Sequence, residues 1–266
     1  MIKAVVFDLD GVILDSEQVW DEVREGLARE RGGRWSEQAQ ADMMGMSSTE
    51  WSRYMHDVVG LPEPPEEINR EVVRRMLDRY SHDLPLIAGA VEAVKRLADR
   101  WPLGVASSSN RELIDRVLEV AGLASYFRVT VSSEEVARGK PTPDVYLEAS
   151  HRLGVEPQHV VAIEDSANGI RSAHAAGMHV VAIPNRAFRR RRTSSRRPSF
   201  WIRSRSSIRK SLRRRSALRF PVAVERALHL DEPDDVPDQW EQEPEACHAA
   251  HGALLPVEVL VHVTDL

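Results

Sequence analysis

The sequence is poor in cysteine and lacks long apolar runs. Cys247 is the single cysteine among 266 residues, which excludes a disulfide framework and a thiolate metal site. A reducing, cytoplasmic location is therefore expected, and residues 1–8 turn acidic too early for a secretory signal. No run of about 18 or more apolar residues occurs, so we expect no membrane-spanning helix.

Charge is distributed unevenly along the chain. Residues 1–185 hold 30 Asp and Glu against 20 Lys and Arg, whereas residues 186–224 hold 14 Arg, one Lys and no acid. A break in composition of this size marks a boundary. We therefore analyse residues 1–185 and 186–266 separately.

Strand-like and helix-like segments alternate in most of the first region. Short β-branched runs separated by amphipathic stretches of about ten residues predict βαβ units and an α/β fold with a doubly wound parallel sheet. The expected strands are 2–7, 103–107, 127–132, 160–163 and 180–183, and the expected helices are 89–100, a helix after Asn110, 143–153 and 168–176.

The segment 15–85 interrupts this alternation. Val19, Trp20, Val23 and Leu27 recur at helical spacing, and a second helical pattern follows three prolines. No strand is expected there. We predict a core of residues 1–14 and 86–185 that carries a small all-helical cap of residues 15–85.

Chemically active side chains follow the expected strands directly. Asp8 and Asp10 come after the first strand, and their spacing points both carboxylates to the same side of extended chain. Gly11 allows a ligand to approach the backbone closely. Two such acids repel each other unless a cation lies between them or one is protonated, although a solvated turn would also suit this pattern.

The later strand ends offer matching groups. Ser107 and Ser108 precede a helix and fit either an anion site or a simple helix cap. Lys140 adds a cation, or is an ordinary surface lysine. Glu164 and Asp165 either cap a helix or complete an oxygen-ligand Mg²⁺ site. Because ligands of such sheets bind beyond the carboxyl ends of the strands, we expect these groups to meet.

The combined pattern resembles the haloacid dehalogenase superfamily. The matching motifs are Asp8-x-Asp10-Gly11-Val12, Ser107, Lys140-Pro141 and Glu164-Asp165, in that order. The helical insertion is similar to the cap of the phosphatase and β-phosphoglucomutase-like branch. The second Asp of the first motif speaks against the dehalogenases themselves.

The resemblance implies a mechanism. Asp8 would be the nucleophile that forms an aspartyl-phosphate, and Asp10 the general acid and base. Mg²⁺ would be held by Asp8, the Asp10 backbone carbonyl, Asp165 and, directly or through water, Glu164. The phosphoryl oxygens would be bound by Ser107, Ser108 and Lys140.

Three cap positions bear on the substrate: Trp20, Gly45 and Ser47. Trp20 stands where β-phosphoglucomutases have a histidine, and we expect it to pack in the cap. Ser48 stands where they have an arginine after the Gly45-Met46-Ser47 loop. With no cation for a distal phosphate, we expect a phosphatase acting on a small, sugar-phosphate-like metabolite; the alternative is phosphoryl transfer within a sugar phosphate.

The region from residue 186 allows two interpretations. The basic stretch 186–224 could bind nucleic acid, with Phe200 and Trp201 stacking on bases. We favour a change of reading frame near Phe188, because the family's last strand and helix are missing here and an alternative frame over 198–211 can spell a strand and an acidic helix start. Residues 231–246 are acidic, poor in apolar side chains and expected to be disordered.

Overall fold

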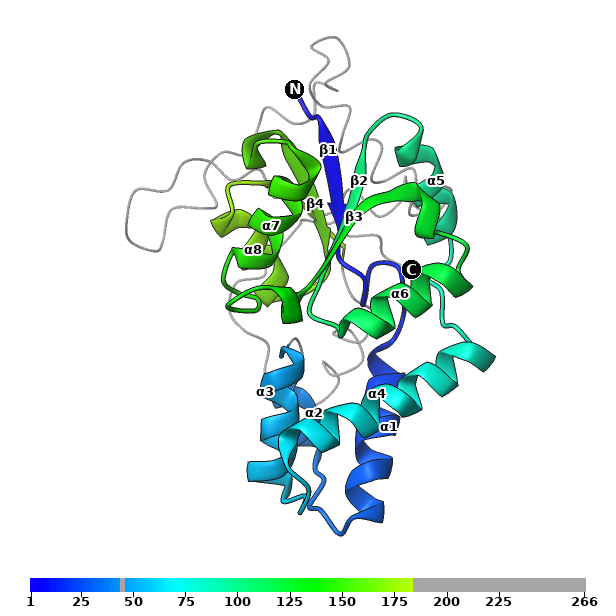
Figure 1. Ribbon diagram of the computed structural model, residues 1–266, viewed down its shortest axis with the longest axis vertical. Coiled ribbons are helices and arrows are strands. Elements are labelled where there is room, and N and C mark those ends of the chain that lie inside the picture. Colours follow the sequence, from blue (N-terminus) through cyan, green and yellow to red (C-terminus); the bar gives the residue numbers. More distant parts are fainter. Residues whose placement is uncertain (44–45, 184–266) are drawn as a thin grey trace, which may run out of the picture.

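Five parallel strands form the central sheet in the part of the chain that the structure describes. The structure, a computed structural model, describes residues 1–43 and 46–183. The strands pair in the order β3-β2-β1-β4-β5, so the first strand lies in the middle (Figure 1). Their bounds are β1 Ala4–Phe7, β2 Leu103–Ser107, β3 Phe127–Ser132, β4 Val160–Glu164 and β5 His179–Ala182. The predicted doubly wound α/β sheet is confirmed.

Both faces of the sheet are covered by helices. Side chains alternate along a strand, so Val5 and Phe7 of β1 join one apolar cluster, whereas Ala4 and Val6 join another. The first cluster includes residues of α5 (Ala90–Ala98) and α6 (Arg111–Val120), and the second those of α7 (Asp144–Leu153) and α8 (Ala167–Ala175). Short 3₁₀ turns occupy Ala124–Tyr126, Ser133–Glu135 and Pro157–His159.

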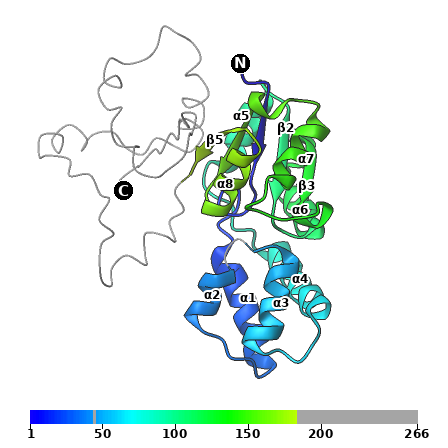
Figure 2. The same cartoon turned by 90° about the vertical axis from the view of Figure 1, so that its left-hand side faces the viewer.

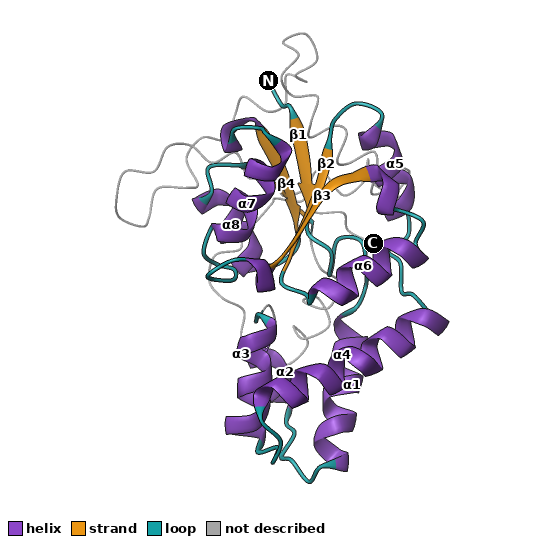
Figure 3. Ribbon diagram, viewed as in Figure 1, coloured by secondary structure: helices purple, strands orange, loops and turns teal. Residues whose placement is uncertain are grey.

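Four helices, which we call the cap, lie beyond the carboxyl ends of the strands (Figures 2 and 3). They are α1 (Glu17–Glu30), α2 (Glu37–Met43), α3 (Ser48–Tyr54), which continues as a π-helix over Met55–Val59, and α4 (Pro65–His82). Proline in the first turn of α4 has its fixed φ where a helix needs it. The chain enters and leaves the cap at one place, where Leu14 and Leu86 form an antiparallel bridge.

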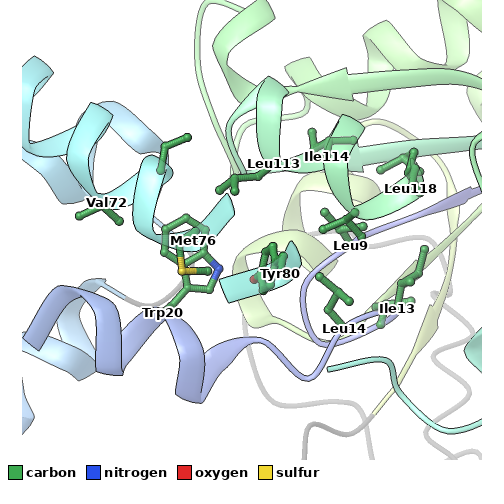
Figure 4. Packing of buried hydrophobic residues seen from close by; sticks show 14 of the residues in the cluster. Leu9, Ile13, Leu14, Trp20, Val72, Met76, Tyr80, Leu113, Ile114 and Leu118 are labelled. Carbon is green, nitrogen blue, oxygen red and sulfur yellow. The ribbon is translucent and has the colours of Figure 1, made fainter. Parts of the chain in front are cut away.

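Apolar packing continues from the cap into the sheet unit. Trp20 of α1 and Met76 and Tyr80 of α4 lie next to Leu9 and Leu14, which follow β1 (Figure 4). All are at most 9% exposed. Burial at this level stabilises the folded state by about 1.5–3 kcal/mol for a large side chain. These apolar contacts therefore hold the cap against the sheet unit.

None of the described helices is both long and apolar enough to cross a membrane. The predictions for residues 186–266, including nucleic-acid binding, the frame change and disorder, lie outside the described residues.

Candidate active site

A pocket lies between the strand ends and the cap. The sheet unit contributes Asp8, Asp10, Gly11, Ser108, Lys140, Asp165 and Ser166, and the cap side contributes Asp15, Ser16, Glu17, Trp20, Asp21, Arg24, Gln40, Met43 and Met46. The strand order explains the first set, because β1 lies between β2 and β4. The topology therefore brings together residues that are up to 158 positions apart.

Lys140 lies at the centre of a buried polar cluster. Its ammonium donates to Asp8 Oδ1 at 2.8 Å and to Glu164 Oε1 at 2.6 Å. Tyr146 OH also donates to Glu164 Oε1, at 3.0 Å. The side chains of all three charged residues are less than 10% exposed. Charged groups this deeply buried are tolerated because each has a partner of opposite charge.

Burial and charge oppose each other in this cluster. Burial raises the pKa of Asp8 well above its ordinary value, Lys140 counteracts the rise, and the nearby carboxylates add to it. Burial alone would lower the pKa of Lys140, but Asp8 and Glu164 outweigh it and raise that pKa. Lys140 therefore stays charged, and an additional cation near Asp8 would favour its carboxylate form.

Two glycines allow the acids to approach the backbone. A Cβ on Gly11, whose φ is +78°, would lie 1.8 Å from Asp165 Oδ2, and one on Gly169 would lie 1.6 Å from Glu164 Oε1. Any side chain at either position would force the carboxylate away. The first glycine was expected from the sequence; the second was not.

Glu164 is fully engaged by the protein. Besides Oε1, its Oε2 accepts hydrogen bonds from the backbone N–H groups of Asp165 and Ser166 at 2.9 and 3.0 Å and from the Ser166 hydroxyl at 3.1 Å. The loop after β4 is thus folded around this carboxylate. Glu164 fits a supporting role better than direct contact with a ligand.

Asp10 points toward the cap. Its Oδ1 accepts hydrogen bonds from the Ser16 hydroxyl at 2.5 Å and from Trp20 Nε1 at 3.2 Å, and its Oδ2 accepts one from the Ser109 hydroxyl at 2.6 Å. Three donors from two segments, the start of α1 and the loop after β2, hold this carboxylate in one orientation. Sequence reasoning found Asp10 and Trp20, but not that Trp20 contacts Asp10.

The two predicted phosphate-binding serines lie differently. Ser108 lines the pocket. Ser107 is fully buried, and its hydroxyl accepts a hydrogen bond from the backbone N–H of Ser109 at 3.0 Å. Ser107 therefore shapes the loop, whereas Ser108 borders the cavity.

The carboxylates fit a divalent cation. Asp8, Glu164 and Asp165 each have a carboxylate oxygen within 4.8 Å of the other two, although both oxygens of Glu164 already accept hydrogen bonds. Hard oxygen ligands of this kind suit Mg²⁺. The Asp10 carboxylate does not belong to this group of side chains.

The three predicted cap residues differ in their relation to the pocket. Trp20 lines the pocket. Ser47 begins α3, where it forms a capping box with Glu50, and it is not among the lining residues. Gly45 lies outside the described residues.

Sequence reasoning missed Arg24. It is 7% exposed and lines the pocket, so the argument that the cap offers no cation overlooked it. A signal was present: Arg24 follows Trp20 by four residues and lies between Val23 and Leu27, within the apolar stripe of α1.

A parallel α/β sheet with clustered carboxylates and a lysine at its strand ends, under a helical cap, defines an enzyme class that handles small oxyanionic substrates. A sequence profile of the haloacid dehalogenase-like hydrolases matches residues 5–183. The chain belongs to this family, as its motifs predicted.

Relatives agree with this assignment. Hexitol phosphatase B of Escherichia coli K12 is 32% identical over 203 residues, which cover 69% of this chain and 84% of that protein. The phosphorylated carbohydrates phosphatase of Thermotoga maritima is 31% identical over 181 residues, or 66% of this chain and 82% of that protein. The crystal structure of CbbY from Rhodobacter sphaeroides in complex with phosphate has a TM-score of 0.61 at 26% identity, covering 69% of this chain and 87% of that one. The prediction of a phosphoric monoester hydrolase is confirmed at the level of the family.

Proposed function

We propose that the protein is a Mg²⁺-dependent phosphatase that hydrolyses a small polyhydroxylated phosphate ester, such as a sugar or polyol phosphate. The observation that carries this proposal is the convergence of Asp8, Lys140 and Asp165 on one pocket, with Asp10 fixed beside them. The named activities of the curated relatives support the substrate class.

In the first step, Asp8 attacks the phosphorus atom and the ester P–O bond breaks. Protonated Asp10 gives its proton to the leaving alkoxide oxygen, which departs as an alcohol. Lys140 offsets negative charge on the phosphoryl oxygens, and Ser108 borders the same space. The phosphoryl group is then bound to the Asp8 carboxylate.

In the second step, a water molecule attacks the aspartyl-phosphate. Asp10, now ionised, accepts a proton from this water, and the bond between phosphorus and the Asp8 oxygen breaks. Inorganic phosphate leaves, Asp8 is again a carboxylate and Asp10 is again protonated. The hydrogen bonds from Ser16, Trp20 and Ser109 keep Asp10 oriented through both steps.

Asp8, Asp165 and the Asp10 backbone carbonyl would hold Mg²⁺, and Glu164 would contact it through water. When bound, the ion would screen charge between Asp8 and the phosphoryl oxygens. The two proposed domains, the cap of residues 15–85 and the core of residues 1–14 and 86–185, enclose the reacting groups between them.

Phosphate release from a panel of phosphorylated sugars and polyols tests this proposal. We expect release with Mg²⁺, none after chelation and recovery when Mg²⁺ is restored. Asp8→Asn should lower turnover at least about a thousandfold with an unchanged circular dichroism spectrum. Asp78→Asn, at an exposed position of α4, is the matched control.

Substantial turnover by the Asp8→Asn protein would remove Asp8 as the nucleophile. Activity that is unaffected by chelation would remove the metal. An isomerised sugar phosphate without released phosphate would establish the mutase alternative instead.

A further inference from the structure

Arg24 packs against two neighbouring indole rings in the cap. Its Cζ lies 4.5 Å from the centroid of the Trp20 ring and 4.8 Å from that of Trp51. The ring centroids are 6.0 Å apart with an angle of 59° between the planes. Stacked guanidinium groups gain cation–π energy and lose orientational freedom. The clamp therefore fixes the guanidinium before any ligand arrives.

This clamp leaves hydrogen-bonding capacity unused. Arg24 Nε is buried and has no hydrogen-bond partner among the described residues. The Arg24 side chain also lines the pocket. A buried donor without a partner costs about 1–3 kcal/mol. The terminal guanidinium nitrogens are not among the buried unpartnered atoms of the described residues, so it is these nitrogens that a ligand in the pocket would meet.

The surroundings of Arg24 show which kind of acceptor fits. Six acids and two bases, Arg24 and Lys140, are among the described residues that line the pocket. Burial lowers the pKa of Arg24 to about 10, an effect that Asp21 and Asp10 oppose, so the group remains charged at neutral pH. A second anionic group on the ligand would be repelled by this excess of carboxylates. A hydroxyl adds no charge and avoids that repulsion. A hydroxyl can also donate to the amide oxygen of Gln40, another lining residue.

We propose that Arg24, clamped by Trp20 and Trp51, donates hydrogen bonds to hydroxyl oxygens at the end of the substrate remote from its phosphate. Arg24 is thus the residue that selects polyhydroxylated esters over plain alkyl esters. This inference rests on the proposed phosphatase function, because it assigns the second end of the same pocket.

Two other roles for Arg24 make different predictions. A purely structural arginine would affect all substrates equally when replaced. An arginine that binds a carboxylate or a second phosphate would matter most for esters carrying one. A matched series of six-carbon esters separates the three: glucitol 6-phosphate with hydroxyls, hexyl phosphate without them, and 6-phosphogluconate with a terminal carboxylate.

The experiment compares kcat/KM of the Arg24→Met variant with that of the unsubstituted protein on these three esters. Methionine retains an unbranched stem between the rings but has no donor. We expect kcat/KM for glucitol 6-phosphate to fall about ten- to a hundredfold, as for the loss of a charged hydrogen bond, and kcat/KM for hexyl phosphate to change less than about threefold. Arg24→Lys should recover part of the loss. Arg29→Met, at an exposed position of the same helix, is the control.

Binding provides a readout that does not require turnover. Calorimetric titration of Asp8→Asn with glucitol 6-phosphate should give a Kd about tenfold or more below that of the Asp8→Asn/Arg24→Met double variant, and hexyl phosphate should not distinguish the two. If the natural chain hydrolyses none of the esters, the phosphatase proposal fails, and this titration still decides the role of Arg24.

Three results would overturn the inference. They are an equal loss on all three esters, no loss on glucitol 6-phosphate, and a loss that is largest on 6-phosphogluconate. The last would assign Arg24 to a distal oxyanion and would strengthen the mutase alternative.

Discussion

Two buried cations, Lys140 in the sheet unit and Arg24 in the cap, line the same pocket but differ in their contacts with the protein. Lys140 donates to Asp8 and Glu164 at 2.8 and 2.6 Å. Arg24 packs against two aromatic rings but has no partner for its Nε among the described residues. The counter-charges of Lys140 are thus part of the fold, whereas the described residues supply no hydrogen-bond acceptor for Arg24 Nε.

This difference indicates that the two cations have separate roles. The core carries a polar cluster whose members need one another to remain buried, so its composition is tied to stability. The cap carries a cation that packs against two aromatic rings and whose Nε has no hydrogen-bond partner among the described residues. The first arrangement suits a constant reaction, and the second suits a choice among substrates.

The largest expected effect is on the core cation. Lys140→Met leaves Asp8 and Glu164 buried beside each other without their shared ammonium, and breaking a buried pair costs about 3–5 kcal/mol. Urea denaturation should show this loss in the free energy of unfolding. Lys95→Met, at an exposed position of α5, should change it little. If the urea midpoint of Lys140→Met equals that of the unsubstituted protein, the proposed difference between the two cations is wrong.

A smaller effect is expected from two matched glycines. Gly169→Ala places a methyl group where Glu164 Oε1 now lies, 1.6 Å from the new Cβ, whereas nothing lies within 4 Å of a Cβ on Gly26 of α1. Overpacking should cost Gly169→Ala about 1–3 kcal/mol, while Gly26→Ala should gain up to about 1 kcal/mol. Thermal unfolding of both variants checks the two signs, and a Gly169→Ala protein as stable as the parent would contradict the tight packing.

The smallest effect is expected from the cap cation. Arg24→Met should alter the free energy of unfolding by no more than about 1 kcal/mol, because losing cation–π energy is offset by no longer burying an unpaired donor. The same urea titration measures it. A loss as large as that of Lys140→Met would mean that Arg24 is a structural residue and that the two cations are not different in kind.

Much of the core could be predicted from the sequence. The strands at 103–107 and 127–132 have the predicted bounds, because each is a short segment that stands between helical patterns. Asp8, Lys140 and Asp165 could be expected to meet, since parallel strands end at a common edge. The cap was predicted only as helical. The separate helices α2 and α3 were not predicted, because their polar sequences contain few apolar positions.

The roles of neighbouring residues were harder to predict. Ser107 and Ser108 are adjacent, yet one is buried against Ser109 N–H and the other borders the pocket. Glu164 and Asp165 are also adjacent, yet Glu164 is buried with Lys140 whereas Asp165 lines the pocket. A difference of one residue reverses the direction of a side chain, and which direction faces the cavity depends on loops folded by distant partners.

The sequence by itself determined the sheet, the order of the chemical groups along it and the family, because local pattern and strand-end position do not depend on what packs above. Only the tertiary structure decided what the cap presents to the pocket. Arg24 is a charged residue in an apolar stripe, and its importance arises from Trp51, which is 27 residues away and reaches it only when α1 and α3 have packed.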